Sequence, residues 1–233
     1  MPDQNRKKPI EMYPEDSTVK FLISMFAGCD PVARARELGI TLENDTFQMT
    51  LFGSPYRITW PDGIITSEDP DGIAMYRGGA RTLLLRWLIG GKLLPSTGKF
   101  RTFGELPWGS GYAQVFENRC IKRAANKFGT NLTLFRKASV SLSGRALTHS
   151  DASFEYTMTG GYDLRIFVWE GDDAFPPNAQ ILFSDNFAAG FTAEDCIVSV
   201  ETLLSALSDR MLKITEDPDS YADVDPDNGF SII

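Results

Sequence analysis

Four carboxylates follow two neighbouring predicted strands, and their types and spacing suit metal binding or acid–base chemistry. Glu170, Asp172 and Asp173 come directly after a strand that ends at Trp169, and Asp185 follows the next strand. If the two strands pair as a hairpin, the four carboxylates gather at or near its ends. Such a group can hold Mg²⁺ or Ca²⁺, or supply an acid and a base with separated pKa values. A solvated loop also explains these residues, because turns are naturally rich in Asp.

A second set of residues could bind anions. Four basic side chains share one side of a predicted helix: Arg119, Lys122, Arg123 and Lys127. Aromatic residues stand just before that helix: Phe100, Phe103, Trp108 and Tyr112. Cations beside exposed aromatic rings can hold a phosphate or a stacked base.

The distribution of charge favours a different interpretation of that helix. Residues 73–145 carry 13 basic and 2 acidic side chains, whereas residues 146–233 carry 3 basic and 17 acidic ones. The basic helices can therefore pack beside the acidic half, so that the charges neutralise within one domain. The net charge of −8 and the pI of about 4.8 argue against nucleic acid as a partner. In the alternative, the acidic tail screens the basic face until an anionic partner displaces it.

Few residues are available for other chemistry. His149 is the single histidine, and the adjacent Ser150 and Asp151 cannot form a triad, whose members must converge in space. The cysteines, Cys29, Cys120 and Cys196, are far apart, without a CxxC or Cys/His spacing for zinc or an iron–sulfur cluster. We therefore expect no cofactor and no metal centre of these kinds.

The elements that position these residues follow from hydrophobic periodicity. Helices are predicted over 17–28, 31–38, 73–89 and 112–128, with a last helix opened by the capping box at 192–195 and apolar to Met211. Alternation predicts a hairpin over 47–60, linked by residues 53–55. It also predicts three strands within 154–158, 164–169 and 179–183, which read as an antiparallel meander. Residues 92–111 read as a loop.

We predict the α+β class for the whole chain: a single domain in which an antiparallel sheet, made of the N-terminal hairpin and the C-terminal meander, packs with several helices. Its predicted bounds are 17–214, between a flexible arm at 1–16 and an acidic tail at 215–233. The sequence contains no apolar run near the length of a membrane span and no secretory signal. With scattered cysteines, this predicts a cytoplasmic protein with reduced thiols and no membrane contact.

One block of sequence resembles a known family. The stretch RIFVWEGDDAFPPNAQILF at 165–183, LLLRWL at 83–88 and TGKFRTFGELPWGSGY at 97–112 resemble a bacterial and archaeal family classed as a domain of unknown function, common in anaerobes. The similarity covers roughly residues 18–210. Some relatives carry a fused four-cysteine iron–sulfur module, which is absent here. The resemblance implies a free-standing domain in an anaerobe's cytosol. It supplies no catalytic residues and points to the ELPW and WEGD loops.

Three functional hypotheses remain open. The first is a binding or accessory domain that holds a small ligand or protein partner between the 100–112 and 170–177 loops. Its walls would be Trp108 and Trp169, with Arg101 as the cation and Glu170, Asp172 and Asp173 for polar specificity. The second is a metal-assisted enzyme that uses these carboxylates around Mg²⁺. The third is an anion- or nucleic-acid-binding module that works through the basic 119–127 helix. The oligomeric state is not predicted.

Overall fold

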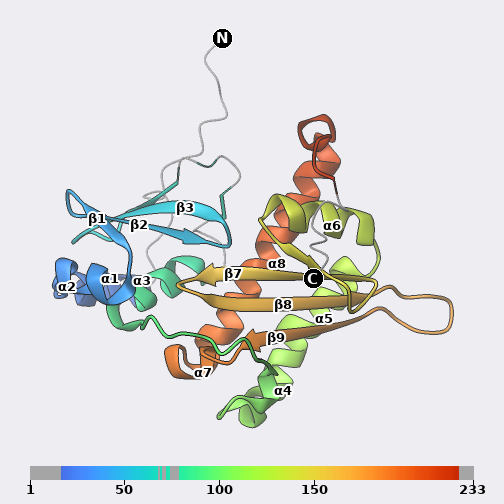
Figure 1. The fold of residues 1–233 in the computed structure, drawn as a ribbon, viewed down its shortest axis with the longest axis horizontal. Helices are drawn as coiled ribbons and strands as arrows, with labels where there is room; N and C mark the ends of the chain where they lie inside the picture. Colours follow the sequence, from blue (N-terminus) through green and yellow to red (C-terminus); the bar gives the residue numbers. More distant parts are fainter. Residues whose placement is uncertain (1–16, 68, 70–71, 74–78, 226–233) are drawn as a thin grey trace.

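The computed structural model describes residues 17–67, 69, 72–73 and 79–225. Two antiparallel sheets and the helices around them make up this part of the chain, so the predicted α+β class is confirmed (Figure 1). The predicted arm at 1–16 lies outside the described residues, as do residues 226–233 of the predicted tail.

The first two helices form where the sequence predicts them. α1 (Ser17–Ala27) turns an apolar face toward the core. α2 (Pro31–Leu38) begins after Asp30, whose side chain accepts two backbone N–H groups of the first turn. The helix ends at Gly39, whose φ of 63° lies in the left-handed region that glycine adopts without strain.

The N-terminal sheet contains the predicted hairpin. Its strands follow chain order: β1 (Thr41–Glu43), β2 (Thr46–Leu51), β3 (Ser54–Thr59) and β4 (Ile65–Thr66). Phe52 and Gly53 connect β2 to β3, and both have positive φ, 48° and 78°, as tight two-residue hairpin turns require. The turn thus begins one residue before the predicted 53–55 link.

The C-terminal sheet has the order β5-β9-β8-β7-β6, and all neighbours are antiparallel. The predicted meander is confirmed as β7 (Ala152–Thr159), β8 (Tyr162–Trp169) and β9 (Asn178–Ser184). The edge strands β6 (Arg145–Leu147) and β5 (Phe100–Thr102) were not predicted. Alternation cannot reveal them, because three residues are too few to show a period of two.

The helices after the N-terminal sheet differ from expectation at their starts. Ile73 is not helical, residues 74–78 lie outside the described residues, and α3 (Ala80–Gly90) begins later than the predicted 73–89 helix. The predicted 112–128 helix begins three residues earlier, at Gly109. It is continuous through α4 (Gly109–Phe116), a π-helical turn (Glu117–Ile121) and α5 (Lys122–Phe128).

The core includes buried residues of both sheets, and a large part of it lies between the C-terminal sheet and the helices behind it in Figure 1. Phe154, Ile166 and Ile181 lie opposite one another on β7, β8 and β9, and all are buried. The unpredicted α6 (Leu132–Ser141) and the long α8 (Ala193–Glu216) pack against each other. The predicted capping box of α8 is confirmed, since Thr192 and Asp195 hydrogen-bond reciprocally.

The chain continues in ordered structure past the predicted end of the domain at residue 214. The short α7 (Phe187–Gly190) comes before α8. α8 itself ends at Glu216, and a short turn (Asp219–Tyr221) follows it. The guanidinium of Arg210 lies 5.6 Å from the centre of the Tyr221 ring. This contact holds the beginning of the acidic segment against α8.

Candidate functional site

The carboxylates predicted for metal binding lie in the loop between β8 and β9. The side chain of Asp172 accepts the backbone N–H groups of Ala174 and Phe175, at 2.8 and 2.7 Å, and so closes the loop on itself. Asp173 and Glu170 are exposed. The backbone N–H of Glu170 donates to the Asp151 carboxylate at 2.9 Å. These contacts are those of a polar turn.

Asp185 is not beside these carboxylates, which corrects the expectation that all four gather. β8 and β9 are antiparallel, so Trp169 lies opposite Asn178 at the loop, and Asp185 follows the far end of β9. There it accepts hydrogen bonds from Ser96 and Thr97. Over the described residues, no three His, Cys, Asp or Glu side chains gather in a group that could hold a metal ion. The geometry therefore gives no support to the metal-assisted enzyme.

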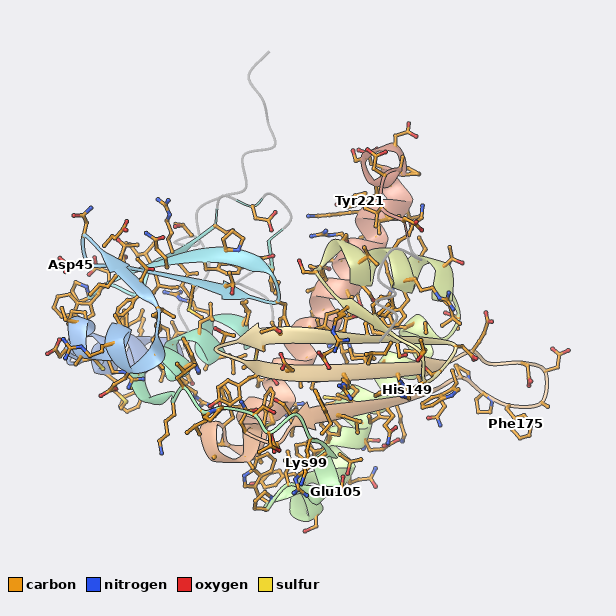
Figure 2. All side chains as sticks on the ribbon, in the orientation of Figure 1. Asp45, Lys99, Glu105, His149, Phe175 and Tyr221 are labelled. Carbon is orange, nitrogen blue, oxygen red and sulfur yellow. The ribbon has the colours of Figure 1, made fainter. Side chains whose placement is uncertain are left out.

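The remaining residues predicted to bind a ligand are spread over two regions. Arg101 is exposed on β5, and Trp108 is half-buried against the Phe103 ring, 5.4 Å between ring centres. Trp169 is half-buried at the end of β8. Figure 2 places Phe175, in the β8–β9 loop, far from Glu105 in the 100–112 segment. The structure thus does not bring these two parts of the predicted loops together.

A groove lies instead between the 100–112 segment and the first half of β9. Its volume is about 300 Å³, and it is lined by residues 102–104, 113, 116–117, 121 and 178–181. None of the six predicted ligand-binding residues lines it. The groove adjoins the predicted 100–112 loop. Its opposite side is formed by β9 and not by the predicted 170–177 loop.

One side of the groove is the first half of β9, which has β8 on one side and, within the described part of the chain, no strand on the other. The N–H of Asp185 donates to the backbone carbonyl of Lys99 at 3.0 Å. Because the backbone groups of successive residues point to opposite sides of a strand, every second residue before Asp185 in β9 also points its N–H and C=O toward the β5 side. By this alternation Ile181 and Ala179 face that side, but β5 ends at Thr102, opposite Leu182. The N–H of Ala179 instead donates to the side chain of Asn178 at 2.8 Å. A side chain thus occupies a position that a strand would take.

Aromatic rings form the second wall. The rings of Phe103 and Phe116 are stacked, with centres 4.3 Å apart and planes 3° from parallel. The Phe103 turn is held by a capping box in which the Glu105 carboxylate accepts from the backbone and hydroxyl of Thr102. These hydrogen bonds, the backbone one first, lower the pKa of Glu105. The capping box therefore holds the turn that carries Phe103 in place.

The π-helical turn forms the third side. π-helical turns are rare and occur frequently at functional sites. This one contributes Glu117 and Ile121 to the groove and points Arg119 the other way, toward α8. Arg119 donates to Glu201 at 2.9 and 2.6 Å and to Glu194 at 3.0 Å.

The other basic residues predicted for anion binding lie on the same helical run. Arg123 donates to the Ser205 hydroxyl at 2.9 Å, and Lys122 donates to the Asn118 side chain at 2.9 Å. Lys127 is exposed in the last turn of α5. Arg119 and Arg123 thus both contact α8, as expected if the basic middle packs beside the acidic half.

Sequence reasoning missed Phe103, Phe116, Ala179 and Ile181 as groove residues. One signal was available: Thr102 and Glu105 have the spacing of a capping box, which marks an ordered turn inside the predicted loop. The free edge of β9 left no such signal, since it depends on where β5 ends.

These features define an α+β domain of two antiparallel sheets with a groove at one strand edge. Residues 30–206 match the family described as a domain of unknown function, DUF3786, and the chain belongs to that family. The resemblance of the sequence motifs is confirmed to that extent. No curated protein and no solved structure matches the chain. None of the helices among the described residues is long and apolar enough to cross a membrane.

Proposed function

We propose that this protein is a non-catalytic binding domain whose β9 groove takes an extended peptide segment of a partner protein. The segment would add as a strand beside residues 178–181 and continue the sheet where β5 ends. The observation that carries the proposal is the Ala179 N–H, which faces the groove and donates to the side chain of Asn178. In strand addition, main-chain hydrogen bonds supply affinity and the pockets for alternate side chains supply specificity.

The lining residues favour a particular peptide chemistry. Phe103, Phe116 and Ile121 offer apolar surface, and Tyr112, which is 48% exposed, lies one helical turn before Phe116. Glu117 is the one charged residue among those that line the groove. A segment with an apolar side chain next to a Lys or Arg therefore fits best.

Location and host belong to this proposal as well. A partner would be met in the cytoplasm of an anaerobe, as the family resemblance implies. The widely spaced cysteines, which form no CxxC motif in this sequence, agree with this location. The fused four-cysteine iron–sulfur module is expected in some relatives only and is not part of this proposal.

A selection experiment tests the groove. Random peptides displayed on phage are selected on the full chain, and the Kd of a synthetic selected peptide is measured by fluorescence anisotropy. Gly104→Trp should fill the groove, since a Cβ at Gly104 meets nothing within 4 Å, and should raise the Kd at least about tenfold. Amide hydrogen exchange at Ala179 and Ile181 should slow when the peptide binds, because a new strand protects both N–H groups.

The matched control is Gly111→Trp on α4, where a Cβ also meets nothing within 4 Å but which does not line the groove. It should leave the Kd unchanged. Glu117→Gln should weaken a peptide that carries Lys or Arg. Equal binding to wild type and Gly104→Trp would place the peptide elsewhere and refute the proposed site.

A further inference from the structure

The first helix carries an apolar surface on the side that faces away from the core. α1 turns three apolar side chains inward: Val19, Leu22 and Phe26. The opposite face of such a surface helix is normally polar. Here Phe21 is 62% exposed and Met25 is 44% exposed, and Lys20 is the one charged residue of the helix. An exposed apolar surface of this kind marks a contact with another molecule.

The exposed residues form a single stripe along the helix. Steps of three, one and three residues place four exposed positions on one side of it: Phe21, Ser24, Met25 and Gly28. The N–H of Gly28 donates to the carbonyl of Met25 at 3.1 Å, so the helical turn extends one residue beyond Ala27. We call these four residues the α1 stripe. Figure 1 shows α1 at the end of the molecule opposite the β8–β9 loop, where a second molecule has access to it.

The polar and charged groups of the stripe permit burial. The hydroxyl of Ser24 donates to the carbonyl of Phe21 at 2.7 Å, so covering it leaves no hydrogen bond unmade. The stripe contains no charged side chain. Two copies of a chain with a net charge of −8 repel each other in general, but at this surface they meet without like charges.

The order of large and small residues says what covers the stripe. Read from either end, a large side chain at one position corresponds to a small one at the other: Phe21 to Gly28, and Met25 to Ser24. Two such helices that lie antiparallel therefore place each large side chain against a small residue of the partner. A Cβ at Gly28 would meet only the carbonyl oxygens of Met25 and Ser24 within 4 Å, so the space above Gly28 is open to a ring.

We propose that the α1 stripe is the contact surface between two copies of this chain. The two α1 helices pair antiparallel about a two-fold axis that passes between positions 24 and 25. The same patch then serves both copies, as in most homodimers. Phe21 lies against the partner's Gly28, and Met25 lies against the partner's Ser24. The stripe shares no residue with the β9 groove, so the contact does not depend on peptide binding there.

Sedimentation of the full chain tests the contact. The stripe is roughly 10 Å long, so the contact is small and the association weak. Between about 1 µM and about 1 mM protein, the measured mass should rise from 25.9 kDa toward twice that value. Met25→Glu should hold the mass at 25.9 kDa, because the two-fold axis brings both new carboxylates together. Gly28→Leu should do the same by filling the space for the Phe21 ring.

Phe175→Glu is the matched control, since it places the same charge on an aromatic residue that is 71% exposed at the other end of the molecule. It should associate as wild type does. The proposal fails if wild type keeps a constant mass of 25.9 kDa over the whole range. It also fails if Met25→Glu or Gly28→Leu associates as wild type does, or if Phe175→Glu abolishes association as well.

A cross-link tests the antiparallel arrangement separately. Cys120 and Cys196 are buried, so Cys29→Ser removes the one partly exposed thiol among the described residues. In that background, Ser24→Cys should form a disulfide between two copies under oxidised glutathione, because the axis passes beside position 24. Phe175→Cys in the same background should not. Association without the Ser24→Cys cross-link would overturn the proposed pairing of the helices.

Discussion

At the scale of single residues, the contacts of Arg119 show that the basic helix packs against α8. Its guanidinium contacts Glu201 and Glu194, so the side chain expected to face an anionic partner joins two acidic residues of α8. The hydrogen bond with Glu201, followed by that with Glu194, raises the pKa of Arg119. Because an arginine is charged at every working pH in any case, the effect of this pairing is mechanical: it fixes the π-helical turn against α8.

Removing this contact should have a modest cost. Arg119→Ala should lower the free energy of unfolding by about 1 kcal/mol, since the pair is only partly shielded from water, with 36% of the Arg119 side chain and 23% of the Glu201 side chain exposed. Lys122→Ala, which removes an exposed cation bonded to Asn118, should cost less. Urea denaturation of both variants checks the difference. An equal effect of the two substitutions would show that the Arg119 pairs contribute nothing.

Asp185 gives the fold a defined acid sensitivity. Hydrogen bonds from Thr97, and then from Ser96, lower the pKa of its carboxyl from 3.8 to about 2. A carboxyl whose pKa is lower in the folded state contributes stability above its unfolded pKa and loses it as the pH falls through the folded one. The contribution of Asp185 should therefore be present above about pH 4 and disappear between pH 4 and pH 2.

Asp185→Asn tests that window. In wild type, part of the fall in unfolding free energy between pH 5 and pH 2 comes from Asp185, and the variant should lack that part. Unfolding by urea at a series of pH values measures it. Thr97→Val, which keeps the carboxylate but removes one donor, should move the loss toward higher pH. Parallel curves for wild type and Asp185→Asn would contradict the assignment.

At the scale of elements, the corner between the Phe103 turn and α4 shapes the groove. A Cβ placed on Gly109 would lie 1.8 Å from the carbonyl oxygen of Phe103, closer than any non-bonded contact allows. Only glycine lets α4 start against that carbonyl, so the stacked Phe103 and Phe116 rings depend on it.

Gly109→Ala should therefore destabilise the protein by about 1–3 kcal/mol, as the two backbones must separate. Gly111→Ala, two residues later in the same helix, meets nothing within 4 Å. It should stabilise α4 by about 0.5–1 kcal/mol, because alanine loses less backbone entropy in a helix. Chemical denaturation compares the two. If Gly109→Ala is as stable as wild type, the close approach at this corner is not needed.

At the scale of the whole molecule, the opposite charges of the two halves meet inside one fold. Three arginines of the basic middle segment pair with carboxylates of the acidic segment that follows it: Arg86 with Asp195, Arg119 with Glu201 and Arg145 with Glu155. Arg165 of β8 also pairs with Glu155 of β7 and lies over the Phe100 ring of β5. Together with Arg145 of β6, these contacts extend across the C-terminal sheet. The interpretation that the charges neutralise within the domain agrees with these contacts.

The sequence by itself determined the local features. The Asp30 cap, the Gly39 stop, the capping box at Thr192 and the alternation of β7 to β9 all depend on residues a few positions apart, so they can be read from spacing alone. Short elements without a period, such as β5 and β6, could not be found in this way.

The tertiary structure alone decided the site. Arg101 pairs with Phe183, 82 positions later, and because β5 ends at Thr102, Ala179 and Ile181 have β8 on one side and, among the described residues, no strand on the other. The antiparallel register also places Asp185 at the far end of the sheet from Asp172. No local spacing encodes such long-range pairings, because they are selected by how the whole core packs. The candidate groove is a consequence of that packing, whereas its individual strands and helices follow largely from sequence.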